Sequence, residues 1–347
     1  DDNVAIGALA LSGDTLGSQS VAIGRGALKV QNFTSATSTY NVAVGYSAGE
    51  SVSTGVQNTF IGGLAGDNIT DADNNVAVGY KALSADTLGT DSVAIGIQAL
   101  RDQNFTTATA SYNIAIGRDA GVVISTGVQN TLIGGNTGDA LTTGSYCTFI
   151  GMNAGGAATT GILNAFLGRS SGSAMTTGSK NTIIGSYNGN QGGLDIRTAS
   201  NNIVLSDGDG NPRLRIDSSG YIYSPSTYGL TTGGAANMFI ATDGSFQRST
   251  SSLRYKNTVN DATHGLTELL ALRPVTYKGN NNGETIFGGL IAEEVHDAGL
   301  TEFVQYDDEE RPDALAYGNM VSLCIKAIQE QNALITALTA RVAELEG

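Results

Sequence analysis

The sequence predicts a mostly β fold in three parts: a repetitive β-solenoid shaft, a β-hairpin connector, and a C-terminal α+β domain that ends in a coiled coil. A five-residue core recurs a dozen times at fixed spacing, glycine is abundant at 47 residues, and proline is limited to 4. Glycine without proline, between short β-branched runs, indicates tight turns that separate short strands. The three parts are expected at residues 1–206, 207–250 and 251–347.

The repeat core is a polar residue, three strand-forming residues and a glycine, as in Asn75-Val76-Ala77-Val78-Gly79. Cores start 17 residues apart, except for three spacings of 21 whose extra residues fall near 31–40, 103–112 and 191–200. In each strand the first and third residues share one face and the second residue faces the other side. One strand and two glycine-containing corners per repeat describe a solenoid coil, and coils this small must stack to bury apolar surface.

The core Asn3-Val-Ala-Ile-Gly7, repeated as Ser20-Val-Ala-Ile-Gly24, resembles the head repeats of trimeric autotransporter adhesins. That resemblance implies a narrow, trimeric left-handed β-roll whose inner strands are buried between three chains. We expect the alanine on the second strand face to fit that crowding. The alternative is a single-chain parallel β-helix with wider coils of three strands.

The connector contains Ser206-Asp-Gly-Asp-Gly-Asn211, which has the composition of a calcium loop but lacks the glycine and glutamate that such a loop needs at its sixth and twelfth positions. We interpret it as a hairpin turn between strands at 202–205 and 214–216. A second turn at 217–220 precedes a strand at 221–223, residues 224–234 are expected to be a linker, and a further hairpin is expected at 238–247.

The C-terminal domain is expected to have a helix at 266–272 that stops before Pro274, a strand at 275–278, and a strand that runs into a helix at 287–295. A last helix, at about 319–346, carries heptads. We expect Gln331 to set the register at a cost in stability, and the aliphatic residues allow two or three strands. The alternative is an amphipathic helix on a core. The predicted trimer seam consists of Val321, Cys324, Ile328, Gln331, Ile335, Leu338, Val342 and Leu345.

The boundary stretch Ser251-Ser-Leu-Arg254-Tyr-Lys256 resembles the start of the intramolecular chaperone autoprocessing domain, the S74 peptidase family, which closes many phage tail spikes and fibres. Two later patterns strengthen the resemblance: Leu-x-x-Leu-Arg-Pro-Val-x-Tyr at 269–277 and Gly-x-Ile-Ala-Glu-Glu-Val at 289–295. It implies that the domain assembles a trimer and then cleaves the Thr250–Ser251 bond. The chain departs from the family at Ser252, where aspartate is usual.

In this reading Ser251 is the nucleophile, Lys256 is the general base and Arg254 supports the local turn or a carboxylate. A free lysine is charged at neutral pH, so we expect burial at a trimer interface to lower its pKa. Whether the chain is an enzyme stays open: the residues allow a single-turnover Ser–Lys autoprotease, a cleavage register shifted to Ser249 or Ser252, or an uncleaved domain. Activity on external substrates is not expected.

Composition excludes several classes of function. The net charge of −14 opposes binding to nucleic acid or anionic membranes, and no apolar run reaches the length of a membrane span. No cofactor or metal is expected, because His264 and His296 have no further ligands at metal spacing. Cys147 and Cys324 are interpreted as buried small hydrophobic residues rather than as a disulfide.

Together these features favour a homotrimeric phage tail fibre fragment, made in the host cytoplasm and placed in the virion tail, that binds other tail proteins and a bacterial glycan or outer-surface protein. We expect a longer natural chain with an N-terminal attachment region. The alternatives are a purely structural fibre and a bacterial trimeric surface adhesin, which would end in an apolar anchor rather than in 343–347. Receptor contacts are expected at the insertions and at Tyr40, Tyr80 and Tyr112.

Overall fold

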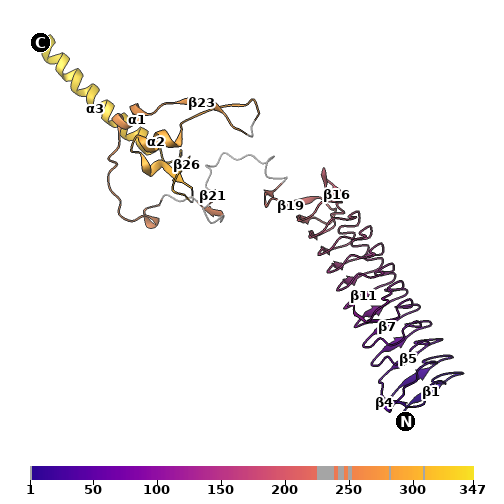
Figure 1. The fold of residues 1–347 in the computed structure, drawn as a ribbon. Helices are drawn as coiled ribbons and strands as arrows, with labels where there is room; N and C mark the ends of the chain where they lie inside the picture. The colour runs from indigo at the N-terminus through magenta and orange to yellow at the C-terminus, as the bar shows by residue number, and fades with distance from the viewer. Residues whose placement is uncertain (1, 225–237, 241–245, 249–251, 281–282, 308) are drawn as a thin grey trace. The chain divides into compact units, whose positions relative to one another are not determined.

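A computed structural model describes the chain except for residues 1, 225–237, 241–245, 249–251, 281–282 and 308 (Figure 1). The chain divides into two compact units, residues 1–233 and 234–347. The region predicted as one connector is shared between them. Its first strands continue the sheet of the first unit, whereas β21 (Met238–Ile240) and β22 (Phe246–Arg248) form a hairpin in the second.

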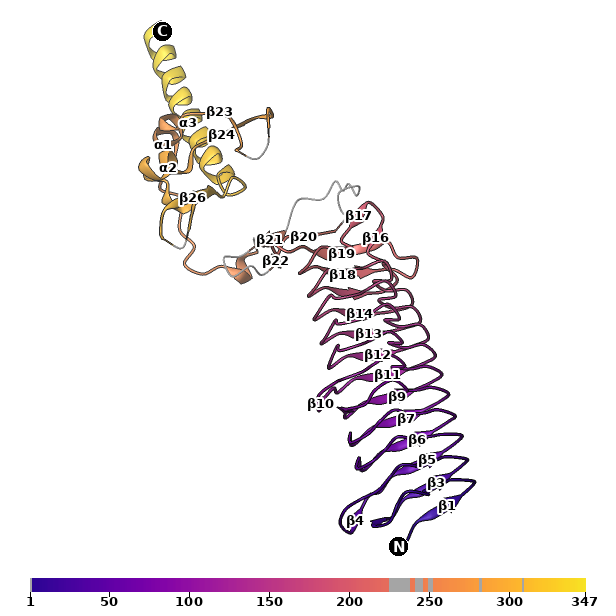
Figure 2. The ribbon, with the colours of Figure 1, turned by 45° about the vertical axis from the view of Figure 1, so that its right-hand side comes forward.

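The first unit is a β-solenoid of about twelve coils, as predicted (Figure 2). Each coil adds one parallel strand in unbroken register, so that Val76 lies opposite both Thr59 and Val93. At about 4.8 Å per strand the stack is roughly 58 Å long. Its strands are β1 (Val4–Ile6), β3 (Val21–Ile23), β5 (Val42–Val44), β6 (Thr59–Ile61), β7 (Val76–Val78), β9 (Val93–Ile95), β11 (Ile114–Ile116), β12 (Thr131–Ile133), β13 (Thr148–Ile150), β14 (Ala165–Leu167), β15 (Thr182–Ile184) and β18 (Ile203–Ser206).

The middle residue of each strand points into its own coil from β3 onward. Ala77 and Ala94 are fully buried within the single chain, and so is Phe60 at the same strand position. The expectation that these alanines are buried between chains is therefore wrong. In a coil with alanine on its strand, a larger aliphatic residue from the corner, such as Leu83 or Leu100, fills the space and keeps the interior close-packed.

A ladder of buried asparagines ties neighbouring coils together. Asn75 donates its Nδ2 to the carbonyl of Gly89 at 2.9 Å, and its backbone N–H donates to Oδ1 of Asn58 at 2.9 Å. The same pair of bonds recurs along the stack and satisfies polar groups that the narrow interior would otherwise leave unpaired. Three cores replace the asparagine: Ser20, Ser92 and Cys147.

The glycine that ends each core lets the coils approach closely. Gly79 has φ +133°, and a Cβ atom there would lie 2.5 Å from the carbonyl oxygen of Gly96 in the next coil. No L side chain fits this position, because the backbone conformation and the space both exclude it. The glycine therefore turns the chain at the corner and also sets the coil-to-coil contact.

The four-residue insertions take two forms. The first two pair with the preceding coil in short parallel ladders, β2 (Gly17–Ser18) with β4 (Thr37–Ser38) and β8 (Gly89–Thr90) with β10 (Thr109–Ala110). The third forms an antiparallel hairpin of β16 (Asn190–Gln191) and β17 (Leu194–Asp195).

The predicted hairpins close the C-terminal end of the solenoid. Strand β18 pairs antiparallel with β19 (Pro212–Ile216), which pairs with β20 (Ile222–Tyr223). Asp207 accepts the backbone N–H groups of Asp209 and Asn211 at 3.1 and 2.8 Å, which makes the segment a turn, as predicted, rather than a calcium loop.

The second unit has the predicted order of elements. Helix α1 (Leu266–Ala271) precedes the hairpin of β23 (Val275–Lys278) and β24 (Ile286–Gly289), which leads into α2 (Ala292–Asp297). A second hairpin, β25 (Val304–Tyr306) with β26 (Pro312–Leu315), precedes α3 (Val321–Glu346). The small core contains Val295, Leu300, Phe303, Val304, Met320 and Leu323.

Candidate functional site

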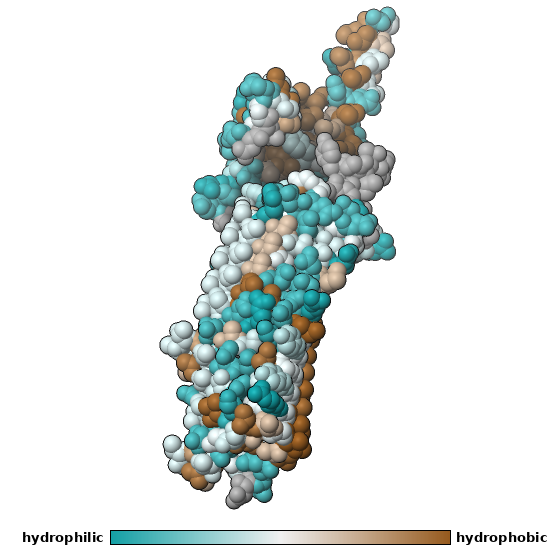
Figure 3. Space-filling view, turned by 90° about the vertical axis from the view of Figure 1, so that its right-hand side faces the viewer, coloured by the Kyte–Doolittle hydropathy of each residue, from teal (hydrophilic) through white to brown (hydrophobic). Residues whose placement is uncertain are grey.

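An uninterrupted aliphatic column runs along the outer face of the solenoid sheet. It consists of the third residue of each strand in the parallel stack from β1 to β18. The third residue faces outward because the middle residue of the same strand occupies the interior. Ile61 is 40% exposed and Leu167 is 48% exposed, although both lie in regular strands. A brown band on the side of the solenoid marks apolar surface there (Figure 3). The column is Ile6, Ile23, Val44, Ile61, Val78, Ile95, Ile116, Ile133, Ile150, Leu167, Ile184 and Leu205.

The column is large enough to call for a partner. Twelve adjacent aliphatic side chains on a surface of roughly 58 Å form a far more continuous patch than soluble monomers usually expose. The first residues of the strands flank it, mostly as valine in the early coils and mostly as threonine later, for example Val42 and Thr148.

Helix α3 exposes the predicted seam. Val321, Ile328 and Leu338 are each more than half exposed, and Cys324 and Gln331 are exposed as well. The helix packs on its own unit through another face, on which Leu323 and Ala327 are buried. The two readings of the helix therefore apply to different faces: one is packed on a core, and the other carries an unburied heptad seam.

The predicted cleavage site falls partly outside the described residues, since Thr250 and Ser251 both lie there, as does Ser249. Ser252 precedes a 3-10 turn at Leu253–Tyr255, and the backbone N–H of Lys256 closes it on the carbonyl of Leu253 at 3.0 Å. Lys256 is exposed in the single chain, so the burial expected of a general base would have to come from a partner chain. Arg254 lies over the ring of Tyr255 at 5.3 Å, and no described carboxylate forms an ion pair with it.

The histidines have local partners. His264 Nδ1 lies 2.7 Å from Glu302 Oε1, which raises the pKa of this histidine, and His296 Nδ1 lies 2.9 Å from the hydroxyl of Tyr306. No cluster of three or more potential metal ligands occurs within the described part of the chain.

The two cysteines differ in environment. Cys147 is buried, as predicted, and burial raises the pKa of its thiol to about 11. Its Sγ donates to the carbonyl of Gly161 at 3.3 Å, in the place of a ladder asparagine. Cys324 is exposed in the single chain, so the expectation of a second buried thiol is wrong for this structure, although its position on the seam explains the exposure.

The tyrosines named as receptor contacts are on the surface. Tyr40, Tyr80 and Tyr112 are each about half exposed, and Tyr40 and Tyr112 occupy equivalent left-handed positions just before ladder asparagines. Among the helices that the structure describes, none is long and apolar enough to cross a membrane.

Comparisons with protein-family models, with curated proteins and with solved structures found no significant match to this chain. The two family resemblances therefore rest on the residues quoted above.

Proposed function

We propose that the chain is part of a homotrimeric phage tail fibre that attaches the virion to a bacterial surface. The observation that carries this proposal is the aliphatic column: twelve outward-facing side chains in register, five of them more than a third exposed, need a partner surface of the same length and spacing. Copies of the same chain supply such a surface, and trimers match both family resemblances.

The exposed seam of the C-terminal helix α3 supports the same trimeric assembly. Isoleucine or valine at one seam position and leucine at the other are compatible with a three-stranded coiled coil. A trimer of the C-terminal unit would hold three chains together before their solenoids stack. Such alignment is useful because identical repeats can pair in a wrong register, and long-range strand pairing is slow.

The C-terminal domain would then hold three chains together during assembly and afterwards cleave the Thr250–Ser251 bond that joins it to the shaft. In the trimer, burial of Lys256 would favour its neutral form, and the neutral amine would accept the proton of the Ser251 hydroxyl as this hydroxyl attacks the carbonyl of Thr250. The separated shaft would persist because its unfolding barrier is high.

Sedimentation equilibrium of the whole chain tests the central claim. We expect a mass near three times the 35.5 kDa monomer for uncleaved protein, or near three shafts after cleavage. A well-folded monomer at micromolar concentration would refute the proposal, because nothing would then cover the aliphatic column.

A further inference from the structure

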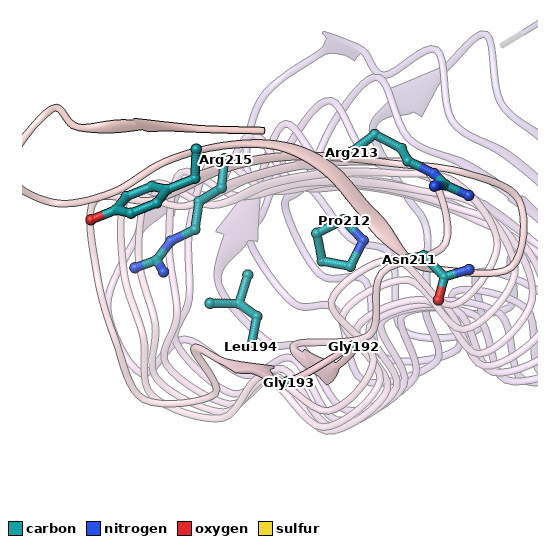
Figure 4. Close-up of a pocket in the computed structure, with 8 residues that line it drawn as sticks. Gly192, Gly193, Leu194, Asn211, Pro212, Arg213 and Arg215 are labelled. Carbon is teal, nitrogen blue, oxygen red and sulfur yellow. The ribbon is translucent and has the colours of Figure 1, made fainter. Parts of the chain in front are cut away.

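The third insertion builds a pocket at the C-terminal end of the solenoid. Hairpin β16–β17 reverses at Gly192 and Gly193, whose φ values of +61° and +81° suit a two-residue hairpin turn. It lies beside β19 and leaves a cavity of about 610 Å³ between them. Leu194 and Arg215 lie on one side of this cavity, Pro212 lies in the middle, and Asn211 and Arg213 lie on the other side (Figure 4).

Arg215 is the unusual residue of this pocket. Its guanidinium lies over the ring of Tyr223, 5.2 Å from the centroid, and its Nη2 donates to Asn202 Oδ1 at 3.3 Å. Its Nε is buried and finds no acceptor among the described residues. A guanidinium carries five N–H donors, and among the described residues Arg215 has one acceptor, Asn202 Oδ1.

Three carboxylates near the pocket already have donors of their own. Asp207 accepts from Arg213 Nε at 2.9 Å, and Asp195 pairs with Arg197 at 2.8 Å. Asp217 accepts the hydroxyl of Tyr223 at 2.8 Å. Among the described residues Arg215 therefore has no carboxylate in an ion pair with it, in a chain whose net charge is −14.

The remaining walls fit a sugar ring. The side chains of Leu194, Pro212 and Tyr223 offer apolar surface for its C–H faces, while the amide of Asn211 can bond hydroxyl groups. Arginine presents a planar fork that matches a carboxylate with two parallel hydrogen bonds. One unpaired guanidinium beside apolar walls is thus the arrangement that would recognise a carboxylate attached to a ring.

We propose that this pocket binds an acidic sugar of the hexuronic acid type, as part of a bacterial surface glycan. This inference rests on the proposed attachment function and names the chemical class of its receptor. It assigns the carboxylate of the sugar to Arg215 and the ring to Leu194, Pro212 and Tyr223.

Isothermal titration of the full chain tests the proposal with three probes: an oligosaccharide of glucuronic acid, the oligosaccharide of glucose with the same linkage, and acetate. We expect saturable binding of the first probe alone, weakened by added salt. Arg215→Gln should weaken it about tenfold or more, because a charged hydrogen-bond donor is lost. Tyr223→Phe should keep most of the affinity, whereas Tyr223→Ala should lose it.

Arg118→Gln is the matched control, since Arg118 is an exposed arginine paired with Asp119 in a central coil, and we expect it to bind like the wild type. Arg215→Lys keeps the positive charge but loses the planar pair of N–H donors, so it should bind the glucuronate oligosaccharide more weakly than the wild type. This second variant still tests the proposal if Arg215→Gln fails to fold. Equal binding of acetate or of the glucose oligosaccharide, an absence of glucuronate binding by the folded chain, or full affinity in both Arg215 variants would overturn the proposal.

Attachment to bacteria separates this proposal from the function on which it rests. We would compare strains with uronic-acid-rich capsules and their acapsular derivatives, with and without the glucuronate oligosaccharide as competitor. Attachment that neither the competitor nor Arg215→Gln reduces would refute the pocket but leave the attachment function. Glucuronate binding without attachment to any strain would refute the attachment function but leave the pocket.

Discussion

Gln103 donates its side-chain amide to the hydroxyl of Ser92 at 2.9 Å, and so takes the place of the asparagine that the ladder lacks there. The same nitrogen donates to Asp86 at 2.6 Å, and Oε1 of Gln103 accepts from Asn113 at 2.8 Å. Gln31 makes the equivalent bonds 72 residues earlier. In both cases a four-residue insertion follows a serine core and supplies the glutamine that completes the ladder.

Removing this bridge should destabilise the shaft. Gln103→Ala deletes three side-chain bonds and leaves the buried polar groups of Asp86 and Asn113 with fewer partners, so we expect the free energy of unfolding to fall by about 2 to 4 kcal/mol. Equilibrium unfolding in denaturant measures this change in free energy. Gln329→Ala, at an exposed position of α3, should change stability by less than about 0.5 kcal/mol. An unfolding midpoint of Gln103→Ala equal to that of the wild type would show that the bridge has no role in stability.

Asp67 should make the shaft more stable in mild acid than in base. Burial raises the pKa of its carboxyl from 3.8 to about 6, and its Oδ1 has no hydrogen-bond partner among the described residues. The folded state therefore holds the proton more tightly than the unfolded state, and the stability that Asp67 contributes below about pH 4 is lost as the pH rises through about 6.

Asp67→Asn should consequently raise the melting temperature more at pH 8 than at pH 5. Asp71→Asn is the control of opposite sign: hydrogen bonds from Ser53 and Thr54 lower the pKa of Asp71, so its replacement should lower the melting temperature at pH 8. A gain for Asp67→Asn that does not change with pH would mean that ionisation of Asp67 is not its cause.

A charge in the aliphatic column should weaken the trimer without breaking the coil. Ile133 faces outward while Leu132 fills the interior, so Ile133→Asp leaves the coil packing intact in a single chain. In a trimer the same carboxylate would be buried without a partner, which costs several kcal/mol. Because α3 can still hold three chains together, we expect the Ile133→Asp trimer to dissociate at a lower denaturant concentration than the Thr143→Asp trimer, whose added charge lies at an exposed corner. An Ile133→Asp trimer as resistant to dissociation as the wild type would exclude this surface as the interface.

Self-cleavage should occur once per chain and only in the trimer. Ser251→Ala and Lys256→Ala should each leave an intact chain that still trimerises, and Lys256→Arg should fail as well because guanidinium keeps its proton. Dilution of the assembled trimer should not slow the reaction, whereas Ile133→Asp should slow it if the column helps to form the trimer. N-terminal sequencing of the small fragment decides the register: Ser251 supports the proposed bond, Ser252 moves it by one residue, and an absence of fragment from a good trimer identifies an uncleaved domain.

The elements of this protein were predictable because their signals are local. A repeat of 17 residues with asparagine and glycine at fixed places excludes small slips within a coil: a slip by one residue would remove Asn75 from the carbonyl of Gly89 and put Val76 in the interior. The heptads of α3 and the turns around Asp207 and Asp217 also depend on residues close in sequence. The pocket at Arg215 was not predicted, because Leu214-Arg215-Ile216 shows only the alternation of a strand.

The sequence by itself determined the repeat length, the strands, their register and the hairpins that close the stack. Only the tertiary structure decided which face of Val76-Ala77-Val78 is inside. Both faces are apolar, so the alternating pattern does not indicate which of them is buried. The choice depends on volume: once Leu83 fills the coil from its corner, alanine is the side chain that still fits, and the valines must face outward. The same packing exposes the aliphatic column, brings Gln103 to Ser92, and leaves Arg215 without an ion pair to any described carboxylate. No local sequence pattern predicts these three features.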